Sequence, residues 1–299
     1  MNDTFLAVIN PAAGGGKRRA QVANLLEQLR AGGLKVEAAE TRAAGDATRI
    51  AREGYARGIR KFIGVGGDGT SYEIVNGLFP LTSAETPSLA FLPVGTGNSF
   101  LRDFSDRGVE FAMEALLARR STACDVLRLK HRSGVLHYIN LLSIGFSADV
   151  ASLRARRFSG WGEAGYQLSI FICLARFRRR SFPVRFDDEG KFDKRPCLFL
   201  TFSNSKFTGG TMMIAPKAEI NDGLIEFVRW GPIGRMGLVR NLPTLYDGTH
   251  IGHPLAERRS AKRIDFELDG PVDVMVDGEV MSLNCERLEV LPSALQVVV

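Results

Sequence analysis

The chain has 299 residues, 45% hydrophobic and 24% charged, a composition typical of a globular protein large enough for two cores. Its net charge of +6 is compatible with anionic lipids, nucleotides or nucleic acid and does not choose among them. No apolar run is long enough to span a membrane, and the four cysteines form no C-x-x-C pair, which argues against a zinc site or a disulfide framework. The N-terminus lacks a signal-peptide pattern, so we expect a cytoplasmic protein.

Strand and helix patterns alternate in the first part of the chain. Apolar strands are predicted at residues 5–10, 36–41, 62–65 and 87–93, and helices at residues 20–29, 47–57 and 72–78. Asp46 is the predicted N-cap of the second helix. This alternation predicts a parallel sheet with helices on both faces.

Glycine-rich loops follow three of these strands, at residues 10–17, 66–70 and 95–98. Ligands of open α/β sheets bind at the carboxyl ends of strands, so we expect the three loops to meet there. Glycine lets the backbone approach a ligand closely, and the N–H groups that begin a helix point at anions. Asp68 lies inside the second loop, where a carboxylate suits a metal ion or a polarised hydroxyl. These loops predict a phosphate-binding site.

The second loop has an alternative interpretation. Gly64, Gly66 and Gly69 match G-x-G-x-x-G after a strand, and Glu85 lies near the spacing of a ribose-binding acid, as in dinucleotide-dependent oxidoreductases. That hypothesis gives Asp68 and Thr70 no role. A simple tight turn, in contrast, would explain one or two glycines but not four in six positions.

From about residue 121 the pattern changes to strands. A hairpin is predicted from residues 124–130 and 135–142, followed by strands at residues 182–186, 197–203, 223–229, 263–268, 272–276 and 295–299. The sequence therefore predicts an α/β domain at residues 1–128 and a mostly antiparallel β domain at residues 129–299.

One apolar helix, predicted at residues 162–180, interrupts these strands. Trp161 precedes it and the run Arg178-Arg179-Arg180 ends it. Such a helix suits the surface of an anionic membrane, with the arginines on phosphate or lipid headgroups. It equally suits a core helix with cations at its C-terminal end, and both interpretations remain open.

Two Asp-Gly pairs, Asp222-Gly223 and Asp277-Gly278, are expected hairpin turns. A turn of this kind can also direct carboxylate and carbonyl oxygens at a hard cation. Glu279 follows the second pair and is either a surface carboxylate or the residue that takes a proton from an alcohol in a kinase.

Four ordered motifs, at residues 66–70, 93–98, 215–223 and 276–279, together resemble the diacylglycerol kinase catalytic-domain family. That family includes bacterial lipid kinases, sphingosine kinases and ceramide kinases, and is distantly related to NAD kinases and phosphofructokinases. The resemblance covers essentially the whole chain. It implies an N-terminal α/β domain with a phosphofructokinase-like and NAD-kinase-like parallel sheet, a C-terminal antiparallel β-sandwich domain, and ATP in a cleft between them.

The resemblance also implies roles for individual residues. Glu279 would accept the proton of the lipid hydroxyl, Asp68 would act near nucleotide-bound magnesium, and Asp125 would join an acidic network. Asp222 would hold a structural Mg²⁺ with the main-chain oxygens of Glu219 and Leu224. The implied ATP contacts are Asn10, Pro11, Ala12, Ala13, Gly14, Thr41, Gly66, Gly67, Asp68, Gly69, Thr70, Ser71, Tyr72, Glu73, Gly95 and Thr96.

One position departs from the family pattern. Bacterial diacylglycerol kinases often carry an aspartate where this chain has Ser99, so the acidic network assigned to Asp125 lacks a member, and the assignment to diacylglycerol itself is weakened.

The resulting prediction is an ATP- and magnesium-dependent lipid kinase, a phosphotransferase with an alcohol acceptor, in the cytoplasm and peripheral at the membrane. Its substrate would be diacylglycerol, a sphingoid base, ceramide or a phospholipid headgroup. No nucleic acid partner is expected, and a homodimer is left open. The alternatives are a kinase of a soluble substrate such as NAD and a catalytically inactive lipid-binding protein.

Overall fold

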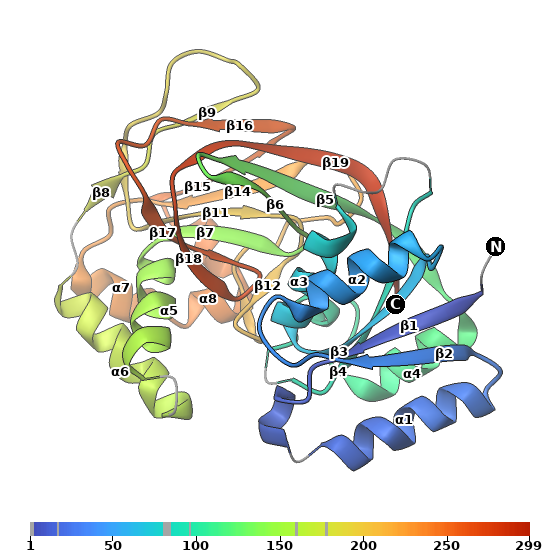
Figure 1. Cartoon of the computed structure of the whole chain (residues 1–299). Coiled ribbons are helices and arrows are strands. Elements are labelled where there is room, and N and C mark those ends of the chain that lie inside the picture. The colour runs from blue at the N-terminus through green and yellow to red at the C-terminus, as the bar shows by residue number, and fades with distance from the viewer. Residues whose placement is uncertain (1–2, 17, 80–84, 96, 159–160, 177–178) are drawn as a thin grey trace. The chain divides into compact units, whose positions relative to one another are not determined.

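The computed structural model describes residues 3–16, 18–79, 85–95, 97–158, 161–176 and 179–299 (Figure 1). The chain forms two compact units, each described here by itself. Unit 1 comprises Met1–Val126, His137–Ile139 and Leu291–Val299, and unit 2 comprises Leu127–Leu136 and Asn140–Val290. Two long strands, β5 (Ser121–His131) and β19 (Cys285–Val298), contribute residues to both units.

Unit 1 is built on a parallel sheet, as the sequence predicts. Its strands are β1 (Thr4–Ile9), β2 (Lys35–Glu40), β3 (Lys61–Gly66) and β4 (Ser88–Pro93), in the order β2-β1-β3-β4. The last residues of β19 pair in parallel with β4. The inner strands β1, β3 and β4 are almost wholly buried, whereas β2 lies at the edge and is more exposed.

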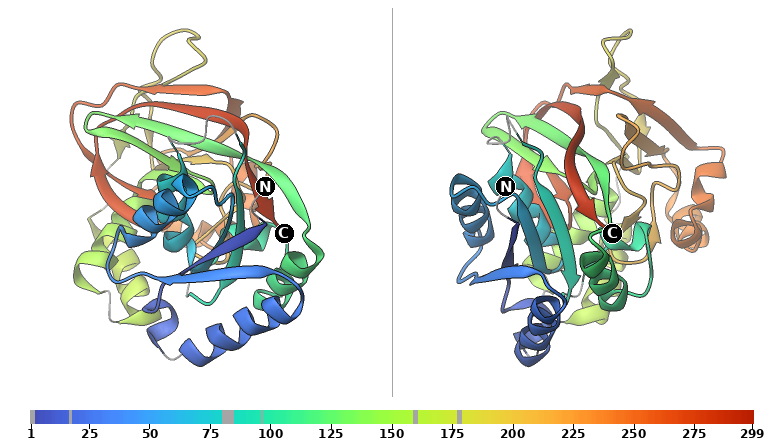
Figure 2. Two further views of the ribbon diagram at one scale, coloured as in Figure 1. Left: turned by 45° about the vertical axis from the view of Figure 1, so that its right-hand side comes forward. Right: turned by 90° about the vertical axis from the view of Figure 1, so that its right-hand side faces the viewer.

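Helices cover both faces of this sheet (Figures 1 and 2). The helices α1 (Arg19–Ala31) and α4 (Val109–Ala118) lie on one face, and α2 (Asp46–Ala56) and α3 (Asp68–Leu78) lie on the other. In α1, the buried residues Val22, Leu25, Leu26 and Leu29 follow the spacing of a single helical face. Short 3-10 helices occur at Ala13–Gly16 (η1) and Phe100–Asp103 (η2).

Two sequence expectations for these helices are wrong. Asp46 is not the N-cap of α2, because Gly45 occupies that position in a left-handed conformation (φ 86°) and Asp46 instead accepts the Arg42 N–H (2.8 Å). Helix α3 begins at Asp68, earlier than the predicted residue 72. The predictions also omitted α4.

Unit 2 contains an antiparallel β-sandwich, as the family resemblance implies. One sheet has six strands in the order β15-β14-β11-β7-β17-β18, and the strands β9, β16 and β19 pair antiparallel in the other. Phe227 and Phe202 of the six-stranded sheet pack against Phe186 and Phe266, with ring centroids 4.8 and 5.2 Å apart respectively. These rings form the core between the two sheets.

The strands of unit 2 have the following bounds. The six-stranded sheet consists of β7 (Leu141–Gly145), β11 (Phe199–Ser203), β14 (Ile225–Trp230), β15 (Ala256–Ala261), β17 (Val272–Val276) and β18 (Glu279–Leu283). The other strands are β8 (Arg180–Ser181), β9 (Val184–Phe186), β10 (Pro196–Cys197), β12 (Phe207–Thr208), β13 (Met212–Met213) and β16 (Arg263–Phe266). Strand β6 (Gly134–Tyr138) forms the predicted hairpin with β5, and its last two residues belong to unit 1.

Four helices and a 3-10 turn complete the described part of unit 2: α5 (Phe146–Arg157), α6 (Gly162–Ala175), α7 (Arg235–Asn241), α8 (Thr244–Asp247) and η3 (Thr249–Gly252). Only α6 was predicted, and it ends at Ala175 rather than residue 180. Arg180 lies in β8 and pairs with Asp149, while Arg178 falls outside the described residues. In the described part of the chain, no helix is both long enough and apolar enough to cross a membrane.

Asn76 of α3 holds the short segment His137–Ile139 of unit 1. Its Nδ2 donates to the His137 carbonyl and its Oδ1 accepts the His137 N–H, both at 2.8 Å. One amide side chain thus satisfies both backbone groups of a buried residue, as a neighbouring strand would.

We therefore expect Asn76→Ala to destabilise the protein by about 2–4 kcal/mol, because it removes both hydrogen bonds that Asn76 makes to the His137 backbone. Differential scanning calorimetry of the whole chain would measure the change. Gln28→Ala, on the exposed side of α1, is the control and should change stability by less than about 0.5 kcal/mol. Equal effects of the two substitutions would contradict the role of Asn76.

Candidate active site

The loops after β3 and β4 meet through their backbones. Gly95 N donates to the Gly66 carbonyl and Asp68 N donates to the Gly97 carbonyl, both at 2.9 Å. A Cβ atom on Gly67 would lie 2.6 Å from the Gly97 oxygen, and one on Gly95 would lie 2.6 Å from Gly67 N. Side chains at these two positions are therefore excluded by the contact between the loops.

The loop after β1 reaches the same edge of the sheet. Asn10 Oδ1 accepts the Ala12 N–H (3.0 Å), and Asn10 Nδ2 lies 3.5 Å from Thr70 Oγ1. Arg18, just beyond the loop, donates from Nη1 to the Val94 carbonyl (2.8 Å). Pro11 and Ala12 are exposed beside them. The three glycine-rich loops thus come together, as their position after parallel strands predicts.

Two further residues complete the loop after β1. Ala13 begins η1, and Gly14 follows it with φ 66°. A Cβ atom on Gly14 would meet the Val94 carbonyl at 2.9 Å, so this glycine also permits a close approach between loops.

Asp68 is the first residue of α3, and its carboxylate joins α3 to η2. Both carboxylate oxygens lie 2.9 Å from Ser99 N, and Oδ1 lies 3.5 Å from Phe100 N. Burial raises the pKa of the Asp68 carboxyl, while these N–H groups favour its ionised form. Asp68 therefore holds the loop after β4 in place, a role that the sequence analysis did not foresee.

The rest of the motif forms the first turns of α3. Thr70 and Ser71 are buried, Gly69 and Tyr72 are half-buried, and a Cβ atom on Gly66 would collide with Thr70 Oγ1 at 2.3 Å. Glu73 turns its carboxylate to the start of α2, where Oε1 accepts Gly45 N (2.9 Å) and Oε2 accepts Ala47 N (3.0 Å).

Two predicted ATP contacts remain, Thr41 and Thr96. Thr41 is buried just after β2, and its N–H donates to the Ile9 carbonyl (2.8 Å). Thr96 lies outside the described residues.

Glu85 lies where a ribose-binding acid cannot act with the glycine loop. Its carboxylate pairs with Arg60 Nε at 2.7 Å, and the two residues precede β4 and β3 respectively. They therefore lie at the amino ends of the parallel strands, opposite the glycine loops. The dinucleotide hypothesis is wrong on this geometry.

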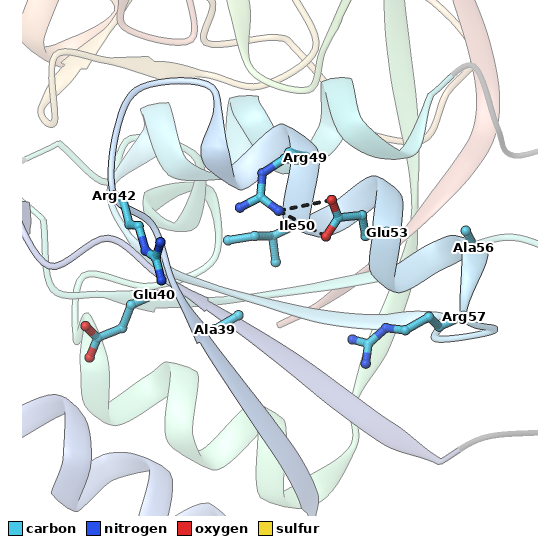
Figure 3. Close-up of a pocket in the computed structure, with 8 residues that line it drawn as sticks. All are labelled: Ala39, Glu40, Arg42, Arg49, Ile50, Glu53, Ala56 and Arg57. Atoms are coloured by element: carbon cyan, nitrogen blue, oxygen red, sulfur yellow. Dashed lines mark hydrogen bonds and ion pairs between the residues drawn. The ribbon is translucent and has the colours of Figure 1, made fainter.

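A surface groove runs along α2 and the edge strand β2 (Figure 3). Arg49 pairs there with Glu53 (3.0 Å) and Asp46 (3.3 Å). None of the predicted ATP contacts lines this groove, although Glu40 and Arg42, which do line it, flank Thr41 in the chain. The groove therefore does not by itself identify a ligand site. The lining residues are Ala39, Glu40, Arg42, Arg49, Ile50, Glu53, Ala56 and Arg57.

In unit 2, Asp277 and Gly278 form the hairpin turn between β17 and β18. Both have positive φ (47° and 89°), as a type I′ turn requires, and Val276 pairs with Glu279 across it. Asp277 is buried, and its Oδ1 accepts the N–H groups of Asn140 (3.1 Å) and Leu141 (3.0 Å).

Glu279 follows this anchored turn and is exposed at the start of β18. Asp277 thus fixes the backbone that carries Glu279. The sequence analysis recognised the Asp-Gly turn but missed this side-chain role, for which the left-handed conformation of Asp277 is the structural sign.

The other Asp-Gly pair, Asp222-Gly223, forms a local turn. Asp222 Oδ1 accepts the Leu224 N–H (2.9 Å), Gly223 has φ 72°, and Glu219 is exposed nearby in the chain. The described residues contain no group of three His, Cys, Asp or Glu side chains that could hold a metal ion. The expected magnesium site needs only one carboxylate and two carbonyls, an all-oxygen donor set suited to a hard cation.

Asp125 is fully buried in β5, where its Oδ1 accepts the Ser293 N–H at 2.7 Å. Ser293 has a left-handed backbone (φ 51°), so the carboxylate stabilises an irregular point in β19. The catalytic network assigned to Asp125 stays a prediction.

Comparison with known proteins gives two family matches that together span nearly the whole chain. Residues 4–129 match the diacylglycerol kinase catalytic domain, and residues 140–299 match the YegS C-terminal NAD kinase beta sandwich-like domain. The chain belongs to the diacylglycerol kinase family. It is therefore a kinase that acts on an alcohol group.

Relatives of this kinase align over nearly their full length. The "Probable lipid kinase YegS-like" of Yersinia enterocolitica is 26% identical over 283 residues, covering 92% of this chain and 90% of that protein. The diacylglycerol kinase of Bacillus subtilis is 27% identical over 278 residues, covering 91% and 88%. A crystal structure of a diacylglycerol kinase from Bacillus anthracis has a TM-score of 0.72 at 20% identity, covering 99% and 96%, which supports the fold.

The loop contacts lead to a matched pair of glycine substitutions in this kinase. Gly95→Ala places a methyl group against the Gly67 backbone, whereas the nearest atom to a Cβ on Gly97 is 3.6 Å away. We expect Gly95→Ala to weaken ATP binding at least about tenfold and to cost roughly 1–3 kcal/mol of stability. Gly97→Ala should leave both nearly unchanged. Isothermal titration with ATP and thermal unfolding would measure the two effects, and similar behaviour of the variants would contradict the contact.

The anchored turn predicts a difference between two substitutions of Asp277. Asn keeps an oxygen acceptor and tolerates the left-handed conformation, whereas Ala leaves the buried Asn140 and Leu141 N–H groups without the Asp277 acceptor. We expect Asp277→Ala to lower stability by about 2–4 kcal/mol and kcat with it, and Asp277→Asn to retain most of both. Thermal unfolding and steady-state kinetics would measure this. A stable, active Ala variant would show that the turn needs no anchor.

Proposed function

We propose that this kinase transfers the γ-phosphate of ATP to a hydroxyl group of a membrane lipid. The observation that carries the proposal is the meeting of three glycine-rich loops at the carboxyl edge of the unit 1 sheet. Phosphoryl transfer depends mostly on positioning and charge neutralisation, and a rigid backbone cradle supplies the positioning.

The start of α3 is the proposed phosphate contact. The Gly69 N–H, in the first turn, has no acceptor among the described residues, while the neighbouring Asp68 and Thr70 N–H groups bond to Gly97 and Gly67 carbonyls. The positive end of a helix dipole favours an anion at this place. The residues that line the cradle would bind ATP, with residues 1–128 as the nucleotide domain.

Glu279 is the proposed general base. It is exposed, and the Asp277 turn fixes its backbone, so its carboxylate is both accessible to a substrate and well positioned. It would accept the proton of the lipid hydroxyl as that oxygen attacks the γ-phosphorus. Residues 129–299 form the proposed lipid domain.

Magnesium is the proposed cofactor. Asp222 with the carbonyls of Glu219 and Leu224 would hold a structural ion, because the three residues are close in the chain around one turn and offer oxygen donors. A nucleotide-bound magnesium would neutralise phosphate charge near Asp68. The loops would orient the phosphates, and Glu279 would take the proton.

The acceptor is proposed to be diacylglycerol or another lipid with a free hydroxyl, because several relatives are named diacylglycerol kinases. A sphingoid base, ceramide or a phospholipid headgroup offers the same reacting group. Since such substrates reside in the bilayer, the enzyme would work peripherally at the cytoplasmic membrane surface.

The test is transfer of radiolabelled γ-phosphate from ATP to a panel of lipids in mixed micelles, with NAD as a further acceptor. We expect label on one lipid class and a loss of at least about 100-fold in kcat for Glu279→Gln, since the base is removed. ATP binding and thermal stability should not change. Glu286→Gln, which alters a surface carboxylate paired with Lys130, is the matched control.

Label on NAD alone would overturn the lipid proposal. Full activity of Glu279→Gln would refute the assigned base while leaving the lipid substrate intact. Binding of ATP without transfer to any acceptor would favour an inactive lipid-binding protein.

A further inference from the structure

Helix α6 presents an apolar stripe to solvent. Ala164, Leu168, Phe171 and Ala175 are exposed at the spacing of one helical face, and Trp161 extends the stripe by one turn. The exposed fractions are 62% for Trp161, 37% for Leu168 and 63% for Phe171. These five residues are called the α6 stripe below.

The opposite side of α6 is apolar as well. Ile170, Cys173 and Leu174 pack on the hydrophobic core of unit 2, and α5 lies between the sandwich and α6 (Figure 1). An outer helix of a globular protein normally turns a polar face to water. An apolar outer face therefore indicates a surface that is covered during function.

Arginines surround this stripe. The segment of residues 146–180 contains seven arginines and two acidic residues, a net charge of +5 in a chain whose total is +6. Arg156 pairs with Asp273, and Arg180 pairs with Asp149. The exposed side chains of four others, Arg154, Arg157, Arg176 and Arg179, have no ion-pair partner among the described residues.

These arginines stand at both ends of the stripe. Arg154 and Arg157 end α5 just before Trp161, while Arg176 and Arg179 follow Ala175. The 14 residues of α6 span about 20 Å. A flat apolar band with cations at each end matches a membrane surface, where acyl chains lie beneath anionic phosphates.

We propose that the α6 stripe inserts into the outer part of an anionic phospholipid bilayer, with the flanking arginines on lipid phosphates. This proposal rests on the proposed function, because an enzyme that phosphorylates a lipid must reach that lipid in a bilayer. A second copy of the chain fits less well. Two-fold packing of stripes would bring the unpaired arginines of both copies together, and like charges repel.

Trp161 provides a direct probe of insertion. The chain has two tryptophans, and Trp230 is fully buried, so a change in emission on adding vesicles would come from Trp161. We expect a blue shift with vesicles of phosphatidylcholine and phosphatidylglycerol, and little with phosphatidylcholine alone. Trp161→Phe should abolish the shift, and brominated acyl chains should quench the emission of the native protein.

Vesicle flotation of the full chain measures the affinity. Phe171→Gln should weaken partitioning about tenfold, because one aromatic side chain no longer leaves water. Arg154→Gln and Arg157→Gln should each weaken it roughly fivefold, and added salt should reduce binding. The matched control is Val135→Gln, an exposed apolar residue of β6 in the same unit, which should partition like the native chain.

The outcomes separate this proposal from the proposed function. Loss of activity on vesicles in Phe171→Gln, with activity on a monomeric short-chain diacylglycerol retained, supports both. Vesicle insertion without phosphate transfer to any lipid supports the docking surface and rejects the substrate. Native partitioning of Phe171→Gln, or a change only in oligomeric mass, overturns the docking surface.

Discussion

The candidate nucleotide site depends on direct backbone contact between two loops. The bonds from Gly95 N to Gly66 O and from Asp68 N to Gly97 O are possible only because no side chain separates the loops. Glycine costs conformational entropy at such positions, so the folded loop must recover that cost through these bonds and through packing. Glycines at positions 67 and 69 add no side chains at the start of α3, which lets an anion approach the backbone N–H groups there.

The acidic residues of the motifs serve mainly to hold the backbone. The carboxylates of Asp68, Glu73, Asp222 and Asp277 all accept backbone N–H groups, as does that of Asp125. Charge-assisted bonds of this kind are stronger than neutral ones and fix loop geometry. Glu279 is exposed, as Asp222 is, but it follows the Asp277 turn, whose bonds to Asn140 and Leu141 fix the backbone that carries it. This anchored and accessible position supports its assignment as the reactive carboxylate.

The features that could be predicted from the sequence are those that depend on local, regular patterns of residues. The four strands of unit 1 and the meeting of their loops followed from apolar runs and glycines. Helices α5, α7 and α8 were missed, because their burial depends on a core formed by distant residues such as Trp230 and Ile214. The role of Asn76 on His137 was also invisible, since 61 residues separate the partners. Asp46 was predicted to cap α2, but the Glu73 carboxylate accepts the N–H groups of Gly45 and Ala47 at the start of this helix. Glu73 lies 26 residues beyond Ala47, so no local pattern indicated this contact.

Ser99 shows how structure changes the meaning of a sequence departure. Its backbone N–H lies 2.9 Å from both Asp68 oxygens, a bond that any residue at this position could make. The Ser99 side chain also hydrogen-bonds to the Asp68 carboxylate and, like the backbone N–H, lowers its pKa. Ser99 is buried (2% exposed), and an aspartate here would place a second carboxylate beside the half-buried Asp68. Two neighbouring carboxylates disfavour each other's ionisation, so the pKa of Asp68 would rise further unless a cation intervened. With serine, the cradle keeps its geometry and Asp68 ionises without that repulsion.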